Sequence, residues 1–124
     1  MKKRVETYIP NALKALQDAN IVISGKYDNE YAGYISAFGP SVIQAGLIPT
    51  VAFYGRKSGD ADRKKVGDAI LKVVAPNENH QEFLFYVLAH DNDRDETKRK
   101  ILDAIVALKL AIRTFEKNEK KRGE

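Results

Sequence analysis

The sequence predicts an all-α fold, a compact single-domain bundle of about six or seven helices that spans residues 1–124. Two observations support this prediction. Apolar residues recur at intervals of three and four along most of the chain, and that spacing places them on one face of a helix. The segments with strand propensity, at 73–74 and 85–87, lack the alternation of apolar and polar residues that a half-buried strand shows.

The first helix is expected over about residues 3–22, where apolar residues form a helical stripe. Pro10 lies inside this stripe and lacks a backbone N–H, so we expect a kink or a late start there. Ser24-Gly25 ends the pattern. The residues of the stripe are Val5, Tyr8, Ile9, Ala12, Leu13 and Leu16.

The second helix is expected to begin at Asp28 or Asn29, because either side chain can accept a hydrogen bond from a free backbone N–H at a helix start. We expect Gly39-Pro40 to break it, since proline ends one helix and suits the first turn of the next. The helical segment then resumes and continues to Arg56. Within it, Gly46 can adopt a positive φ and close a helix, or allow another backbone to approach closely.

Two shorter helices should follow. One is expected over about residues 60–75 and is ended by Pro76, which cannot continue a helix. The other is expected over about residues 78–90, with Asn77 as its cap.

The final helix should follow a turn at residues 91–95, with Asp93 or Asp95 as its cap, and run to about Lys121. Its apolar face is wide, which is typical of a helix that packs against several neighbours. That face consists of Ile101, Leu102, Ile105, Val106, Leu108, Leu110, Ile112 and Phe115.

The composition excludes several classes of chemistry. The chain contains no cysteine, which rules out disulfides, thiolate metal sites and a cysteine nucleophile. No apolar run approaches the ~18 residues that a membrane-spanning helix needs. The basic start, Met1 to Arg4, is followed by polar residues and lacks the pattern of a signal peptide. We therefore expect a soluble cytoplasmic protein.

The net charge of +4 is unevenly distributed along the chain. Residues 1–27 carry five bases and two acids, and residues 97–124 carry nine bases and four acids. Between them, residues 28–58 are neutral, and residues 59–96 carry five bases and nine acids. Two basic ends around an acidic middle indicate one surface for a polyanion and another for a different partner. The alternative is a set of solvated helix faces without a ligand.

We expect no metal site. His80 and His90 are the only histidines and lie ten residues apart, whereas a catalytic zinc site takes three protein ligands, often including an H-x-x-x-H pair. The acidic run at 91–95 resembles a calcium loop only superficially, because Glu96 and Leu102 occupy the places of the required glycine and bidentate glutamate. Surface histidines and an acidic helix start are the expected roles of these residues.

No catalytic constellation is found in the sequence either. The eight glycines form neither G-x-G-x-x-G nor G-x-x-x-x-G-K-[ST], and no serine lies in a G-x-S-x-G motif. Glu96 and Lys98 have the spacing of a nuclease carboxylate–lysine pair, but they lie at the start of a predicted helix rather than on a strand. We predict a non-enzymatic protein without a cofactor. A small metal-dependent hydrolase would require His80 or His90.

Basic residues recur along the final helix. Lys109, Arg113 and Lys117 are spaced at i, i+4 and i+8, which predicts one line of positive charge. Lys109 is the only charged residue in the run 104–112, so its stem should cover the edge of the core while its ammonium group reaches solvent. A lysine of this kind is equally expected on a solvated stripe that binds nothing.

The stretch 31–57, YAGYISAFGPSVIQAGLIPTVAFYGRK, carries the most specific pattern in the chain. It resembles the small helical subunit of the type III-B CRISPR RNA-targeting complex, the fifth protein of the Cmr effector. Residues 112–115 extend the resemblance with an apolar residue, a base and a phenylalanine. A tryptophan frequent there in relatives is missing, and Ala45 stands where relatives often have asparagine. The matching residues are Pro40, Ile43, Gly46, Leu47, Phe53 and Lys57.

This resemblance implies a non-catalytic subunit of a Cmr ribonucleoprotein that contributes to assembly and to RNA binding in antiviral defence. Subunits of this family stack along the effector filament beside the large polymerase-like subunit and line the channel where guide RNA and target RNA pair. The expected partners are that subunit, the backbone repeat-type RNA-binding subunits, which cleave the target, and both RNA strands. The alternative hypothesis is a helical adaptor or regulator that is unrelated to CRISPR and that could bind DNA.

The predicted RNA contacts are basic residues near the two ends of the chain and at the end of the stretch 31–57. Arginine and lysine would bind phosphate oxygens there by charge-assisted hydrogen bonds, which carry little sequence information. These residues are Lys14, Lys26, Arg56, Lys57, Lys109 and Arg113.

Overall fold

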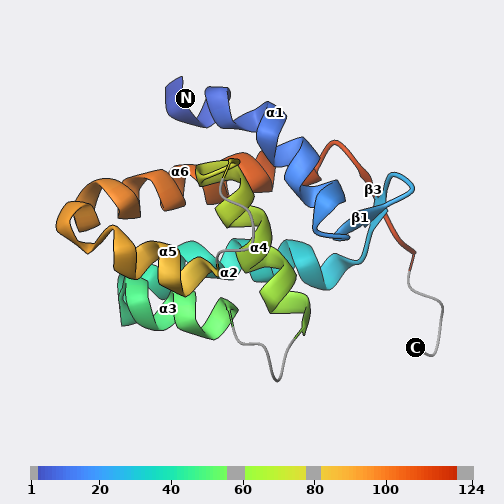
Figure 1. Cartoon of the computed structure of the whole chain (residues 1–124). Coiled ribbons are helices and arrows are strands. Elements are labelled where there is room, and N and C mark those ends of the chain that lie inside the picture. Colours follow the sequence, from blue (N-terminus) through green and yellow to red (C-terminus); the bar gives the residue numbers. More distant parts are fainter. Residues whose placement is uncertain (1–2, 56–60, 78–81, 120–124) are drawn as a thin grey trace.

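The computed structural model describes residues 3–55, 61–77 and 82–119 (Figure 1). Within these residues six α-helices surround one apolar core, and the only strands form a sheet of three two-residue segments, so the all-α prediction is confirmed. None of the described helices is long and apolar enough to cross a membrane. The elements are α1 (Lys3–Asp18), β1 (Val22–Ile23), β2 (Lys26–Tyr27), α2 (Asn29–Ala45), α3 (Leu47–Tyr54), α4 (Ala61–Val74), α5 (Phe83–Ala89), the 3-10 helix η1 (Asp91–Asp93), α6 (Arg94–Ile112) and β3 (Glu116–Lys117).

The helix α6 is the centre of the bundle. It packs against α1, α2 and α4, and Figure 1 shows α1 along one side of it with α2, α3 and α5 on the other. Three buried alanines, Ala104, Ala107 and Ala111, alternate with larger buried residues and allow neighbouring helices to approach closely. The wide apolar face of the final helix is confirmed at Ile101, Ile105, Leu108 and Ile112, which are buried, and at the partly buried Leu102 and Leu110. Val106 was wrongly assigned to this face, because it is 40% exposed, and Phe115 lies beyond the end of the helix.

Pro10 and Pro40 each lie within a continuous helix, so the expected late start at Pro10 and the break at Gly39-Pro40 are wrong. A proline inside a helix removes one backbone hydrogen bond and costs ~3 kcal/mol or more. Burial around Pro40 offsets this cost, because Phe38 and Val42 on either side of it are fully buried while Pro40 itself is exposed.

The break between the second and third helices lies at Gly46 instead. Gly46 has a φ of 98°, and its N–H donates to the Val42 carbonyl at 2.9 Å, which closes α2 as expected for a glycine with positive φ. The hydroxyl groups of Ser41 and Thr50 lie 3.0 Å apart across the turn, and Thr50 is buried. This polar contact joins α2 to α3.

The first helix ends at Asp18, earlier than expected, in a motif that the periodicity did not predict. Asn20 has a φ of 62°, and the N–H groups of Asn20 and Ile21 donate to the carbonyls of Gln17 and Leu16, the two bonds of a Schellman motif. Ser24 and Gly25 then adopt φ values of 53° and 78°, which make a tight turn between β1 and β2. The Ser24-Gly25 break is thus a hairpin turn.

The final helix ends at Ile112, so the expected continuation to Lys121 is wrong. The Thr114 hydroxyl donates to the Ala111 carbonyl at 2.8 Å, a local hydrogen bond that competes with continued helix. The chain then forms β3, which pairs parallel with β2 and places Lys117 opposite Tyr27. Lys117 therefore does not continue the helical line of Lys109 and Arg113.

The expected caps are met in part. Asp28 and Asp93 occupy the positions before α2 and α6, as predicted, although neither side chain caps its helix by a hydrogen bond. The Asp28 carboxylate instead accepts a hydrogen bond from the Asn118 amide at 2.7 Å, which ties β3 to the start of α2. Glu82, rather than Asn77, precedes α5, because that helix begins only at Phe83.

Aromatic rings fill the space between α2, α3 and α5. Phe38 lies 5.0 Å from Tyr54 in an edge-to-face pair and 6.2 Å from Phe83 in a stacked pair. The helix α4 comes closest to α3 at Gly67, where an added Cβ would lie 2.6 Å from the carbonyl oxygen of Tyr54. The absence of a side chain at Gly67 is thus a requirement of helix packing.

Candidate nucleic-acid interface

A hollow of about 140 Å³ lies between α2, α6 and β2, and we refer to it as the basic hollow. Among the described residues that line it, Lys109 and Arg113 are the charged ones, and they lie one helical turn apart near the end of α6. Ser36 adds a hydroxyl group, and the buried Ile35 and Ile112 contribute apolar surface. The lining residues are Tyr27, Ala32, Ile35, Ser36, Lys109, Ile112 and Arg113.

The chemistry of the basic hollow suits an anion. Two cationic side chains and a hydroxyl group line it, and no residue in the described part of the chain contributes a carboxylate to it. Arginine can donate two parallel hydrogen bonds to a phosphate, whereas lysine acts as a point charge. Lys109 is half-buried, as expected for a lysine whose stem covers the edge of the core, and Arg113 is exposed. The hollow is therefore a small positive site carried mainly by helices.

Lys26 lies beside the basic hollow but does not line it. It precedes Tyr27 in β2, and successive side chains of a strand point to opposite faces. Its partner in the parallel register is Glu116, an acid on β3. Lys26 thus contributes positive charge near the hollow and has a carboxylate in the neighbouring position.

Lys14 lies elsewhere, in a hollow of about 180 Å³ between α1 and the end of α4. Lys72 shares this hollow, and its ammonium nitrogen is 4.0 Å from a carboxylate oxygen of Asp18. The structure therefore separates Lys14 from Lys109 and Arg113. Sequence reasoning missed Lys72, because its neighbour Lys14 belongs to another helix.

The other predicted residues are placed as follows. Arg56, Lys57 and His80 lie outside the described residues. His90 is half-buried, with its ring 4.2 Å from that of Tyr86 and its Nδ1 2.8 Å from the Tyr86 carbonyl oxygen. Over the ranges 3–55, 61–77 and 82–119, no group of three or more histidine, cysteine or acidic side chains could hold a metal ion.

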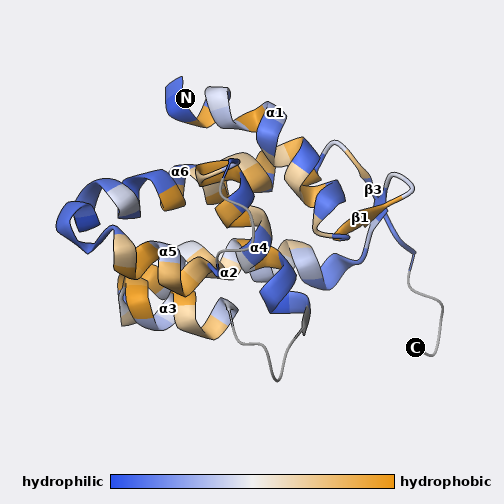
Figure 2. Ribbon diagram, viewed as in Figure 1, coloured by the Kyte–Doolittle hydropathy of each residue, from blue (hydrophilic) through white to orange (hydrophobic). Residues whose placement is uncertain are grey.

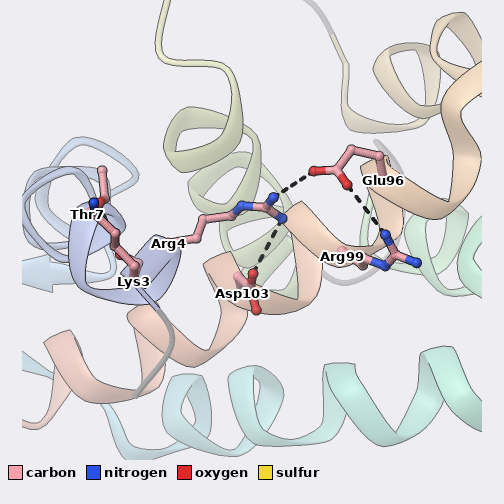
Figure 3. Close-up of polar contacts among 6 residues, drawn as sticks. All are labelled: Lys3, Arg4, Thr7, Glu96, Arg99 and Asp103. Atoms are coloured by element: carbon pink, nitrogen blue, oxygen red, sulfur yellow. Dashed lines mark hydrogen bonds and ion pairs between the residues drawn. The ribbon is translucent and has the colours of Figure 1, made fainter.

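The first basic block is partly used to hold the fold together (Figure 3). The guanidinium group of Arg4, on α1, lies 2.6 Å from Glu96 and 3.4 Å from Asp103, both on α6. Glu96 also pairs with Arg99 at 3.7 Å. Burial beside these charges raises the pKa of Tyr8 above its ordinary value. The positive charge of Arg4 therefore joins α1 to α6 instead of standing free for a ligand.

A family model described as CRISPR-associated protein (Cas_Cmr5) matches residues 8–115. The chain belongs to this family. The match spans α1 to the last turn before β3 and includes the whole basic hollow. No curated protein and no solved structure matches the chain.

Membership in the Cmr5 family confirms the resemblance carried by the stretch 31–57. It also excludes the alternative hypothesis, an adaptor or regulator unrelated to CRISPR. In this chain the family pattern corresponds to the second half of α2, the Gly46 turn and α3. Of its residues, Gly46 and Leu47 serve the turn and the core, whereas Ile43 and Phe53 are exposed.

Proposed function

We propose that this chain is a non-catalytic subunit of a type III-B CRISPR (Cmr) ribonucleoprotein, contributing to its assembly and binding guide or target RNA in cytoplasmic antiviral defence. It acts as one helical domain over residues 1–124, with the backbone repeat-type subunits and the large polymerase-like subunit as neighbours. Family membership supports the Cmr assignment. The observation that carries the RNA-binding role is the basic hollow, where Lys109, Arg113 and Ser36 line a space to which the described residues contribute no carboxylate.

Binding at the basic hollow would fix the position of the RNA backbone without reading its sequence. Arg113 and Lys109 would contact phosphate oxygens, and the Ser36 hydroxyl could donate to the same group. Lys26 would add charge beside the hollow, and Lys14 would form a separate contact on the α1–α4 edge. Arg56 and Lys57 remain proposed contacts that belong to the stretch between α3 and α4.

The test is target-RNA retention by the assembled complex as a function of salt. Each single-strand phosphate that the protein neutralises adds about −0.7 to the slope of log affinity against log salt. The double variant Lys109→Ala plus Arg113→Ala should weaken retention and flatten this slope by about 0.7 for each phosphate that is no longer neutralised. The matched control, Lys120→Ala plus Lys121→Ala, removes the same charge from the C-terminal tail and should do much less. Equal effects of the two double variants would show that only diffuse charge matters.

A further inference from the structure

An arginine lies against two aromatic rings where α2, α3 and α4 meet. The guanidinium carbon of Arg63 lies 4.6 Å from the ring centroid of Tyr34 and 4.7 Å from that of Phe53. These distances are within the range of cation–π attraction for both rings. We refer to Tyr34, Phe53 and Arg63 as the stacking cluster. Its three residues come from three different helices, α2, α3 and α4.

The stacking cluster is held by the core. The Tyr54 hydroxyl donates to the main-chain carbonyl of Tyr34 at 2.7 Å, and the Tyr54 ring meets Phe53 edge-on at 6.0 Å. Tyr31 packs edge-on against Tyr34 at 6.4 Å. Tyr31 and Tyr54 are both buried, so the rings of Tyr34 and Phe53 pack on side chains that belong to the core.

Phe53 is nevertheless open to solvent, with 46% of its surface exposed. Arg63 lies over one face of this ring, so a base can stack only on the other face. An exposed aromatic ring with a cation held against it offers single-stranded RNA both a stacking surface and a positive charge. The ring stacks on an unpaired base, and the cation attracts the neighbouring phosphate. A base within a duplex has no free face, so a site of this kind selects unpaired nucleotides.

The stacking cluster and the basic hollow lie on opposite sides of α2. Tyr34 is two residues from both Ala32 and Ser36, which line the hollow, and two residues correspond to about 200° around the helix axis. The two sites therefore cannot hold the same phosphate. The stacking cluster is a second place at which this chain can meet a nucleic acid.

On the basis of the RNA-binding role above, we propose that Phe53 stacks on an unpaired base of single-stranded RNA while Arg63 attracts the adjoining phosphate. Phe85 provides a control, because this phenylalanine of α5 is 59% exposed. Its helix packs against α3, and Figure 2 shows that the residues of both helices are largely hydrophobic. If the exposure of Phe53 served a protein partner instead, the two phenylalanines would behave alike.

The first experiment measures the affinity of the assembled complex for single-stranded target RNA. Phe53→Ala should weaken it roughly tenfold, the effect of losing one stacked base, without changing the salt slope, since the ring is neutral. Phe53→Tyr should bind normally, and Phe53→Leu, which keeps the apolar bulk and loses the ring, should bind as weakly as Phe53→Ala. Phe85→Ala should have no effect on RNA affinity.

The second experiment uses the absence of tryptophan from the chain. In the free full-length protein, Phe53→Trp supplies a single fluorophore, and an oligouridine of about 12 nucleotides, within the range of site sizes for single-strand binding, should quench its emission by stacking. A duplex of the same length should not quench it, and neither RNA should quench the Phe85→Trp variant.

Several outcomes would overturn the stacking site. They are normal RNA binding by Phe53→Leu, absence of quenching at position 53, or equal effects of Phe53→Ala and Phe85→Ala, which would identify a protein interface. If the Lys109 and Arg113 variants still flatten the salt slope in that case, the proposed RNA-binding function stands and only the stacking site is wrong. If they too have no effect, both are wrong.

Discussion

Replacing Gly67 by alanine should destabilise the protein, although alanine is the better helix former. The added Cβ would lie 2.6 Å from the Tyr54 carbonyl oxygen and 3.4 Å from the Phe83 ring, well inside ordinary van der Waals contact for the oxygen. Overpacking of this kind costs about 1–3 kcal/mol, and a clash with the backbone belongs at the upper end because a carbonyl cannot rotate away. The gain in helix propensity is about 1 kcal/mol. The net decrease in the free energy of unfolding should be about 2 kcal/mol.

The measurement is urea and thermal unfolding followed by the helical circular dichroism signal. A decrease of about 2 kcal/mol should lower Tm by roughly 8 °C for a chain of this size. Gly33→Ala is the matched control, because Gly33 is exposed within α2 and an added Cβ there meets nothing within 4 Å. That variant should gain up to about 1 kcal/mol. If Gly67→Ala were as stable as Gly33→Ala, the close approach of α4 to α3 would be refuted.

Two further perturbations test the polar contacts between helices. Arg4→Ala should lower the free energy of unfolding by about 1–2 kcal/mol, because Asp103, whose side chain is 8% exposed, loses one of its partners. The Arg4 side chain is 35% exposed, which keeps the effect below that of a fully buried pair. High salt should reduce the difference between Arg4→Ala and wild type in urea unfolding. Tyr31 has its pKa raised above the ordinary value of 10, first by burial and then by the hydrogen bond to Asp62, so its neutral form is favoured in the folded state. The contribution of Tyr31 to the free energy of unfolding should therefore be fully present below pH 10 and decrease as pH rises above it. In unfolding curves measured from about pH 8 to 11, Tyr31→Phe should remove part of this pH dependence.

The helices could be predicted from the sequence because most of the apolar residues that recur at intervals of three and four are the residues buried in the core. The rules for single residues were less reliable. Pro40 was expected to break a helix, but the burial of Phe38 and Val42 outweighs the absence of one hydrogen bond. The prediction that Gly46 can close a helix is confirmed, because its φ of 98° is open to glycine without the strain that a side chain would bring.

The small sheet could not be predicted for a different reason. Strands of two residues are too short to show alternation, and β3 pairs with a strand about ninety residues earlier in the chain. The Ser24-Gly25 dipeptide was the one available signal, since serine followed by glycine marks a turn. It was interpreted only as the end of a helix.

The candidate site was predicted in part. The spacing of Lys109 and Arg113 along one helix predicted that they lie on the same side of it, and in the structure both line the basic hollow. No spacing rule could join them to Ser36, which belongs to α2, or separate them from Lys14, which lies at another edge. Arg63 was missed altogether, because its relation to Tyr34 and Phe53 exists only once three helices have packed.

In the basic hollow, the charged groups can be removed without affecting the stability of the fold. Ile35 and Ile112 contribute its apolar surface and are fully buried, so the backbone positions of Ser36 and Arg113 are set by the core next to them. The charged groups themselves extend beyond that core, and Arg113 is exposed. Removing the charges should therefore change RNA affinity without moving Tm, whereas a cavity at Ile112 should lower Tm and displace the neighbouring Arg113. A site built in this way keeps its backbone geometry when its charges are removed, which is what the proposed RNA-binding function requires of a test by substitution.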